Sequence, residues 1–548
     1  MENQDIEFRG NIVDVVGERI FKGVVIVRDS KVAEIREEDT SENVYILPGL
    51  IDAHIHIESS MLVPSEFARL AVVHGTVGTV SDPHEIANVL GVKGVRFMIE
   101  NGKKVPFKFY FGASSCVPAT SFETAGGTLG LAELDELLKS DDILYLSEMM
   151  NFPGVVYGDE LVAKKLALAK KYGKPVDGHA PGLTGKLAEK YVRAGISTDH
   201  ECYTLEEALE KIKYGMKILI REGSAAKNFD ALSDLITEYP EMVMLCSDDK
   251  HPNDLVAGHI NKLVKRAFSM GYDKMKVLRC AIFNPVKHYH LDAGLLQEGD
   301  PADLILVDDL EHFNILATYV NGQKVAENGK TLIPSVAVSP VNQFHAEPVK
   351  SEDLVIRPQG KRIRIMKAID GQLVTKELIV DARIENNEVK SDPENDILKI
   401  VVVNRYFPAP PAVGFVNGFG LKSGAIASSV AHDSHNIIAV GTDDESIKTA
   451  INAIVSSQGG ISVVFGDELS TLPLPVAGIM SDEDGYKVAG IYKNLDEQVK
   501  KKLKSSLKAP FMTLSFMALL VIPVLKLSDK GLFDGKKFSF VELFEKIV

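Results

Sequence analysis

Histidine and carboxylate side chains recur at the ends of apolar, strand-like runs in the first half of the sequence. The run beginning at Ile46 ends in His54-Ile55-His56, and because side chains alternate along a strand, both imidazoles face the same side. Later runs end at Glu148, His179, His200 and Asp248-Asp249. Four imidazoles and two carboxylates suit a pair of divalent ions bridged by one carboxylate, for which Glu148 is the natural candidate. The residue types therefore predict a binuclear metal centre.

Each of these positions also has an ordinary structural explanation. A His-x-His pair can occur by chance in an apolar strand, and His179 follows Gly178 and suits a turn. Asp248 and Asp249 suit the N-cap of a following helix. We favour the metal ligands because ligand-type residues fall together at the ends of strands one, four, five, six and eight.

Eight strand-length apolar runs lie between Ile46 and Asp249, most of them followed by a helix-like stretch such as 159–172 or 205–214. The runs are YILPGLIDAHIHI, TVGTVSDP, FKFYFGASS, DILYLSEMM, PVDGHA, ISTDHEC, KILIREGSA and MVMLCSDD. Eight β-then-α units indicate an α/β fold with a parallel (β/α)8 barrel of the TIM type. Such a barrel brings the C-terminal ends of its strands to one mouth, where the predicted ligands would meet.

The barrel is expected over residues 48–299, and short strands flank it on both sides. We predict that residues 1–47 and 300–340 pair to form one small β-sandwich. A polar, proline-bearing linker is expected around 335–353. Residues 350–548 mix apolar β runs with helix-like stretches such as 444–457 and 495–507, which predicts a C-terminal α+β domain.

Composition limits the classes of partner. The net charge of −15 disfavours binding to nucleic acid, because phosphate backbones would be repelled. Four scattered cysteines and an N-terminus without a basic, apolar leader predict a cytoplasmic protein. The apolar run 511–527 is too short and too interrupted to span a membrane, and we expect it in the core of the last domain.

Several motifs together resemble the adenine deaminase family of the amidohydrolase superfamily. They are PGLIDAHIHIESS, TVSDPHEIANV, VDGHAPGLTG, DHECYT and CSDD, with GAIASSVAHDSHNIIAVG and KGLFD in the last domain. The resemblance spans nearly the whole chain. It implies hydrolytic deamination of adenine to hypoxanthine and ammonia in purine salvage, with manganese or iron as the metal and zinc as an option.

The resemblance also implies how the ligands divide. His54, His56 and Asp248 would hold one ion, His179 and His200 the other, and Glu148 would join them. Dihydroorotases and hydantoinases typically bridge their metals with a modified lysine on strand four, where this chain has Glu148. Water shared by two such ions would lose a proton near neutral pH, and we expect Asp248 to take that proton and pass it to the leaving amine.

Residues outside the ligand set are candidates for contact with the substrate. The second strand is followed by Asp82-Pro83-His84-Glu85, in which Glu85 would hydrogen-bond a ring nitrogen while Asp82 or His84 supports a ligand. A proline turn that starts a helix is the structural alternative. In the last domain, His432 and His435 could reach over the barrel mouth, or form a polar surface loop.

Two other functions remain open from the sequence. A cyclic amidohydrolase would use the same barrel and metals to open a ring, and a non-catalytic scaffold would use the fold for self-association. A scaffold is disfavoured because all six ligand positions are filled. We expect a small purine base as the partner, no nucleic acid or membrane, and a homo-oligomer, most simply a dimer.

Overall fold

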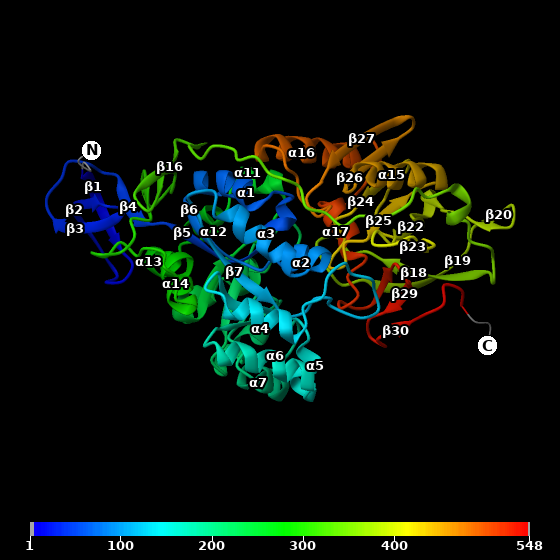
Figure 1. Cartoon of the computed structure of the whole chain (residues 1–548), viewed down its shortest axis with the longest axis horizontal. Coiled ribbons are helices and arrows are strands. Elements are labelled where there is room, and N and C mark those ends of the chain that lie inside the picture. The colour runs from blue at the N-terminus through cyan, green and yellow to red at the C-terminus, as the bar shows by residue number, and fades with distance from the viewer. Residues whose placement is uncertain (1–4, 546–548) are drawn as a thin grey trace.

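The computed structural model describes residues 5–545, and its central body lies between an N-terminal β-sheet at one end and the C-terminal region at the other (Figure 1). Eight parallel strands of this central body close into a barrel. One sheet has the order β13-β5-β6-β7-β8-β9 and another has the order β10-β11-β12. A bridge between Val176 and Ile196 connects them on one side. On the other side, β12 and β13 are consecutive parts of the eighth strand, and β13 pairs with β5. The predicted (β/α)8 barrel is confirmed.

The barrel strands are β5 (Leu50–His56), β6 (Thr76–Ser81), β7 (Lys108–Ser114), β8 (Ile143–Met149), β9 (Val176–Gly178), β10 (Thr198–Asp199), β11 (Lys217–Arg221), β12 (Val243–Cys246) and β13 (Asp248–Asp249). The helices between and after them are α1 (Pro64–Ala71), α2 (His84–Leu90), α3 (Val92–Gly102), α4 (Leu131–Lys139), α5 (Phe152–Tyr157), α6 (Glu160–Lys171), α7 (Gly185–Arg193), α8 (Leu205–Lys213), α9 (Phe229–Leu232), α10 (Leu235–Glu238), α11 (Pro252–Ala257), α12 (Ile260–Ser269), α13 (Lys274–Leu278) and α14 (Asn284–Tyr289).

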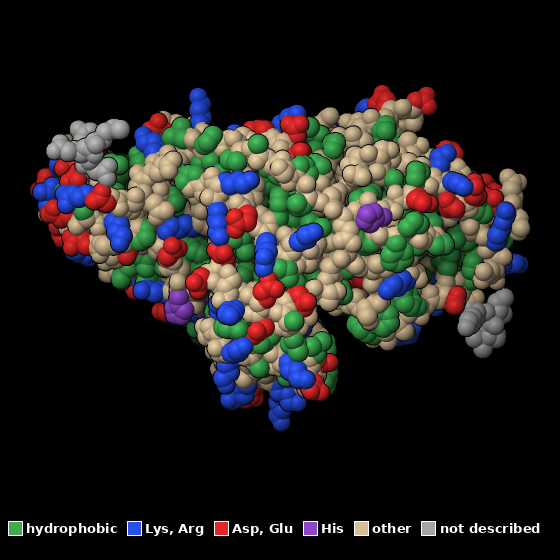
Figure 2. Space-filling view, in the orientation of Figure 1, with side chains coloured by type: hydrophobic (Ala, Val, Ile, Leu, Met, Phe, Trp, Pro, Cys, Tyr) green, Lys and Arg blue, Asp and Glu red, His purple; other side chains and the backbone are tan. Residues whose placement is uncertain are grey.

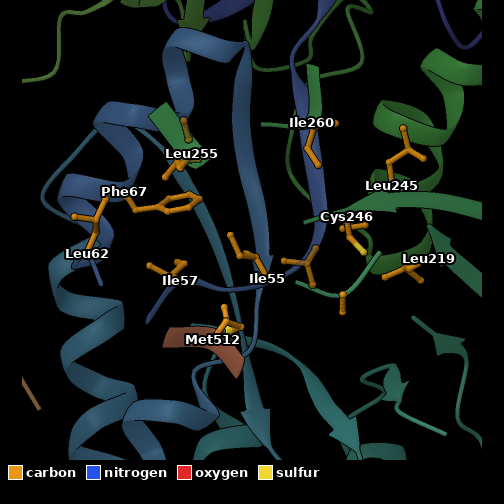
Figure 3. Close-up of a cluster of buried hydrophobic side chains, with 14 of the residues drawn as sticks. Ile55, Ile57, Leu62, Phe67, Leu219, Leu245, Cys246, Leu255, Ile260 and Met512 are labelled. Carbon is orange, nitrogen blue, oxygen red and sulfur yellow. The ribbon is translucent and has the colours of Figure 1, made fainter. Parts of the chain in front are cut away.

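The first barrel strand is buried on both of its faces, because helices cover the outside and side chains fill the inside. Figure 3 shows Ile55 on the outer side, in an apolar cluster with Phe67 of α1, Leu245 of β12 and Ile260 of α12. Its neighbours His54 and His56 consequently face the interior. Alternation along the strand thus separates apolar packing from chemistry.

The strands that flank the barrel form a single eight-stranded sheet, of order β17-β16-β15-β14-β4-β1-β2-β3. Antiparallel pairing of β4 with β14 joins the segment that precedes the barrel in the sequence to the segment that follows it. One face, with Ile46 and Leu304, has a core of its own, while Leu47 and Ile305 on the other face join the barrel core. The members are β1 (Ile6–Asp14), β2 (Arg19–Arg28), β3 (Lys31–Glu37), β4 (Tyr45–Pro48), β14 (Leu304–Val307), β15 (Ile315–Val320), β16 (Gln323–Glu327) and β17 (Lys330–Thr331).

The C-terminal region has its own eight-stranded sheet, of order β19-β18-β23-β22-β25-β24-β26-β27. Helix α15 (Asp444–Ser457) packs on β24, β25 and β26. Helix α17 (Pro510–Phe516) also contacts β24 and β25, and α16 (Gly485–Lys501) packs against α11 and α1 of the barrel. The strands are β18 (Arg362–Lys367), β19 (Lys376–Asp381), β22 (Leu398–Val403), β23 (Ala412–Asn417), β24 (Ala425–Ser428), β25 (Ile437–Gly441), β26 (Gly460–Phe465) and β27 (Glu468–Pro473), with the small pair β20 (Ile384–Glu385) and β21 (Glu388–Val389) and the ribbon β28 (Leu525–Ser528), β29 (Gly531–Asp534) and β30 (Ser539–Phe540).

The helix expected at 495–507 is wrong in its position. Helix α16 begins ten residues earlier, where the Asp484 side chain accepts hydrogen bonds from the backbone N–H groups of Tyr486 and Lys487. It ends at Lys501, and the following buried residues, Leu503 and Leu507, lie outside it. The spacing of these two leucines continues the helical pattern of the sequence, which is why a helix was predicted there. In the structure they belong to an irregular segment that packs into the core.

A long segment without helix or strand links the barrel side to the C-terminal domain. It covers residues 332–350 and follows both bodies closely, since Arg69 Nε of α1 donates to Ile333 O at 3.1 Å and the His345 N–H donates to Arg405 O of the C-terminal domain at 2.6 Å. We propose domain boundaries at 47/48, 299/300 and 350 from these sheets. Among residues 5–545, no helix is long and apolar enough to cross a membrane.

The surface contrasts with the interior in its titratable groups. On the face in Figure 2, Asp and Glu side chains are mixed with Lys and Arg side chains, whereas histidine is scarce. The histidines are scarce there because most of the 14 in the chain are buried, several of them at the barrel mouth.

Replacing Leu245 of β12 with alanine tests the core between the barrel and α12. Leu245 is fully buried, so Leu245→Ala should lower the free energy of unfolding by about 2–5 kcal/mol through lost burial and a residual cavity. A clear drop in the thermal unfolding midpoint is the expected readout. Leu161→Ala is the control, because Leu161 on α6 is 51% exposed. Equal midpoints for the two variants would contradict this description of the core.

Candidate metal centre and adjoining polar cluster

Four of the predicted ligands converge at the mouth of the barrel. Glu148 Oε1 lies 2.9 Å from His54 Nε2 and 2.8 Å from His56 Nε2, and these two nitrogens are 3.2 Å apart. Asp248 Oδ1 lies 3.5 Å from each of the same nitrogens. Strands one, four and eight therefore bring two imidazoles and two carboxylates together.

The other two predicted ligands, His179 and His200, also lie beside the Glu148 carboxylate. His179, directly after β9, places Nδ1 3.0 Å from Glu148 Oε2. His200, directly after β10, places Nε2 3.9 Å from Glu148 Oε1. Its ring also stacks on that of His54, with centroids 4.2 Å apart. The structure thus gathers the other five predicted ligands around Glu148.

This cluster fits the chemistry of divalent ions. Glu148 Oε1 is buried and forms no hydrogen bond with any residue in the range 5–545, although two imidazole nitrogens face it. Imidazole nitrogens and carboxylate oxygens bind such ions at about 2.0–2.2 Å, so ligands of one ion lie roughly 3 Å apart. The nitrogen and oxygen separations match that spacing. His54, Glu148, His200 and Asp248 form one such group, and His179 and His200 belong to another.

The pKa shifts of His54 and Glu148 show that the buried carboxylates of this cluster favour positive charge beside them. Burial opposes protonation of His54, but Asp248 and Glu148 raise its pKa to about 10. Burial likewise opposes ionisation of Glu148, yet His56 and His200 hold the pKa of that carboxyl well below its usual range. Protons on the imidazoles or bound cations can meet this demand.

Sequence reasoning missed a buried ion network beside the cluster. Arg221, the last residue of β11, places Nη1 2.5 Å from Glu201 Oε1 and 2.7 Å from Asp248 Oδ2, and its Nη2 lies 2.9 Å from Glu201 Oε2. Burial would raise the pKa of Asp248, but Arg221 holds that pKa well below its usual range. An arginine closing the apolar strand KILIR was the available signal for this network, and strand seven had supplied no candidate.

Glu85, which the sequence singled out, lies at the centre of a second polar cluster. His84 Nε2 and His432 Nε2 each lie 3.1 Å from Glu85 Oε1, and His435 Nε2 contacts Glu85 Oε2. Burial opposes ionisation of Glu85, but these imidazoles hold its pKa well below its usual range, and His432 has the largest effect among them. His432 and His435 therefore lie inside the site and not on a surface loop.

The remaining candidate, Asp82, lies deeper and supports the two clusters. Its Oδ2 is 3.1 Å from His84 Nδ1, and its Oδ1 accepts a hydrogen bond from Ser114 at 2.8 Å. Its backbone carbonyl lies 3.1 Å from His56 Nδ1. Asp82 thus contacts a residue of each cluster, as expected for a supporting residue.

Residues of both domains line the cavity between the clusters. His56, Glu148, His179 and Asp248 line it from the barrel, and Leu373, Phe516, Leu519 and Val521 cover it from the C-terminal domain. Asp433, between the two cluster histidines, also lines the cavity, and burial raises its pKa to about 6. Its charge was visible in AHDSH, but only the folded chain shows that it faces the cavity.

Comparison with known proteins covers both domains. Residues 45–325 match the amidohydrolase family, and residues 372–539 match the adenine deaminase C-terminal domain. An adenine deaminase from Sulfurovum sp. (strain NBC37-1) is 57% identical over 537 residues, which is 98% of this chain and 99% of the relative.

Relatives from other organisms give the same result. The adenine deaminase of Methanosarcina mazei is 53% identical over 98% of this chain and 99% of its own length. That of Borreliella burgdorferi is 47% identical, with the same two coverages. The chain, with its polar clusters shared between an amidohydrolase barrel and this C-terminal domain, therefore belongs to the adenine deaminase family.

Proposed function

We propose that this protein deaminates adenine, converting adenine and water to hypoxanthine and ammonia. The observation that carries the proposal is the contact of two clusters in one cavity, one suited to metal ions and the other built around Glu85. The first suits activation of water, and the second suits proton exchange with a heterocycle. The names of the full-length relatives supply the substrate.

The amidohydrolases are a metal-dependent family, and we propose that this chain binds two ions. His54, His56 and Asp248 would hold one, and His179 and His200 the other, with Glu148 between them. Divalent ions in such a site supply Lewis acidity that brings the pKa of water close to neutrality. Manganese or iron is the proposed metal, with zinc as an alternative, because imidazole and carboxylate accept all three.

Asp248 is the proposed proton carrier between water and the leaving amine. Its Oδ2 is bound by Arg221, which leaves Oδ1 directed towards the two imidazoles of the first strand. A carboxylate fixed by one oxygen presents the other in a single orientation, which favours proton transfer at that atom. Arg221 acts by positioning Asp248, and Glu201 fixes Arg221 through its two oxygens.

Glu85 is the proposed partner of the purine ring nitrogens. Attack at the amino-bearing carbon places charge on the ring, and a carboxylate with three imidazoles around it can accept or return a proton there. Leu373, Phe516 and Leu519 would cover the apolar faces of the ring and exclude bulk water. The C-terminal domain would thereby complete the site.

The biological setting is proposed from the same argument. A free purine base suits a purine salvage enzyme of the cytoplasm, and a homodimer remains our prediction for the assembly.

The decisive experiment measures turnover of adenine by the metal-loaded protein. We expect one ammonia per adenine consumed, with the absorbance spectrum changing to that of hypoxanthine. A cyclic amidohydrolase would instead open a ring, and a scaffold would show no turnover. Either result would contradict the proposal.

Replacing His179 with asparagine tests the second metal site. His179→Asn should lower the metal content from two ions per chain towards one and reduce turnover on the order of 100-fold or more, because a ligand is lost. Elemental analysis and the ammonia assay measure both effects. His312→Asn is the control, since His312 lies on the surface against Asp309. Full metal content in His179→Asn would argue against its role as a ligand.

Replacing Glu85 with glutamine tests its role in proton exchange. Glu85→Gln keeps the shape but removes the ionisable group, so turnover should fall about 100- to 10,000-fold. Metal content should stay at the wild-type value, because Glu85 is outside the proposed ligand set. Glu100→Gln, at a surface glutamate of α3 that pairs with Lys103, is the matched control. Normal turnover in Glu85→Gln would remove the proposed role.

Replacing Arg221 with lysine tests its positioning of Asp248. Lysine keeps the charge but loses the two-pronged contact with Glu201, so kcat should fall about 10- to 100-fold with little change in KM. Arg193→Lys, an exposed arginine of α7 paired with Glu189, should behave as wild type. If Arg221→Lys raised KM alone and left kcat unchanged, the positioning role would be wrong.

A further inference from the structure

A second pocket lies on the outer side of the eighth barrel strand, and none of the residues assigned above lines it. It has a volume of about 320 Å³ and is bounded by the loop after β11, the segment after β13, and helix α12. Its charged lining residues are Glu222, Lys227, Lys250, Asp254, Lys262 and Arg266. Four cationic side chains thus face two carboxylates, in a chain whose net charge is −15.

The two carboxylates of the pocket are already engaged. Glu222 Oε1 lies 2.8 Å from Arg266 Nη1, and Glu222 Oε2 lies 3.8 Å from Lys227 Nζ. Asp254 Oδ2 accepts a hydrogen bond from Ser224 Oγ at 2.6 Å. Arg266 also contacts Asp230, so Lys250 and Lys262 are the two cations of the pocket that no carboxylate contacts, and Asp254 acts on Lys250 at longer range.

Lys250 is the most informative of these residues because it is buried. It is only 6% exposed, and it has no hydrogen bond or contact ion pair with any residue in the described span 5–545, although Asp254 and Asp52 attract its charge at longer range. Lys262 is exposed and is likewise without such a partner among those residues. A cationic side chain with carboxylates near it but none in contact would be stabilised further by an anion that binds in the pocket.

We propose that this pocket binds the phosphate group of a small metabolite, with Lys250 and Lys262 as its principal contacts. A phosphate offers several acceptor oxygens and up to two negative charges, which matches two unpaired ammonium groups. The volume lies at the lower end of the range for small-molecule sites, about 300–1,000 Å³, and leaves room for more than the phosphate itself. A phosphate monoester is therefore the expected class of ligand.

The pocket shares a wall with the candidate metal centre. Lys250 follows Asp248 and Asp249 directly, and the Ser224 N–H donates to Asp249 O at 2.8 Å. Ser224 Oγ in turn accepts from the His251 N–H at 2.8 Å. An anion held by Lys250 would therefore stabilise the segment that carries Asp248. Binding is expected to raise the stability of the folded chain, because only the folded chain has the pocket.

The test is calorimetric titration of the metal-loaded full chain with ribose 5-phosphate, inorganic phosphate and ribose at constant ionic strength. Ribose 5-phosphate should bind with one site per chain and raise the thermal unfolding midpoint, and ribose should do neither. Tighter binding of ribose 5-phosphate than of inorganic phosphate supports a monoester, whereas equal binding assigns the site to free phosphate. No binding of either would overturn the proposal.

Three variants locate the binding site. Lys250→Met should abolish binding, and Lys262→Met should weaken it at least about tenfold, because each removes one unpaired charge. Lys265→Met is the matched control on the same helix, since Lys265 Nζ reaches Asn314 and not the pocket. Equal affinity in Lys262→Met and Lys265→Met would overturn the assignment.

Lys250→Met also separates a ligand site from a structural lysine. Removing a buried charge without a protein partner should leave the midpoint in ligand-free buffer equal to or above that of wild type. A structural lysine would instead lower it. Lys262 is exposed, so Lys262→Met tests binding even if Lys250→Met folds poorly. None of these measurements depends on adenine turnover.

Discussion

The approach of His54 and His56 to one oxygen of Glu148 is the constraint around which the site is built. Two imidazole nitrogens within 3 Å of a buried carboxylate oxygen are stable only if positive charge is supplied at that point. The barrel brings these side chains together, because the ends of its parallel strands meet at one mouth and side chains alternate between the inside and the outside along each strand. The outer residue, Ile55, packs between barrel and helices and keeps the inner pair in place.

The C-terminal domain contributes polar and apolar side chains to the other side of the cavity. Glu85 belongs to the barrel, yet His435, 350 residues away, contacts one of its oxygens. Phe516 and Leu519 close the cavity with apolar surface. The interface between the domains is therefore also a wall of the site. A change in how the domains pack would move the side chains of the polar clusters.

The segment after the eighth strand carries one paired and one unpaired charge. On one side, Arg221 fixes the carboxylate of Asp248, and on the other, Lys250 faces a pocket rich in cations. A buried ion pair such as that of Arg221 and Asp248 contributes little net stability, but breaking it is costly because one charge is left without its partner. The pair therefore favours a single position for the strand end that carries a proposed ligand.

Strand periodicity and residue type are local properties, and they were enough to predict the barrel and the six candidate ligands. His54 and Asp248 could be placed at strand ends without knowing what they touch. The contacts of Arg221 with Asp248 and Glu201, and of His435 with Glu85, are visible only in the folded chain, since such pairs join strands or domains far apart in the sequence. Pairing of this kind depends on how strands close and domains dock, which no local pattern encodes.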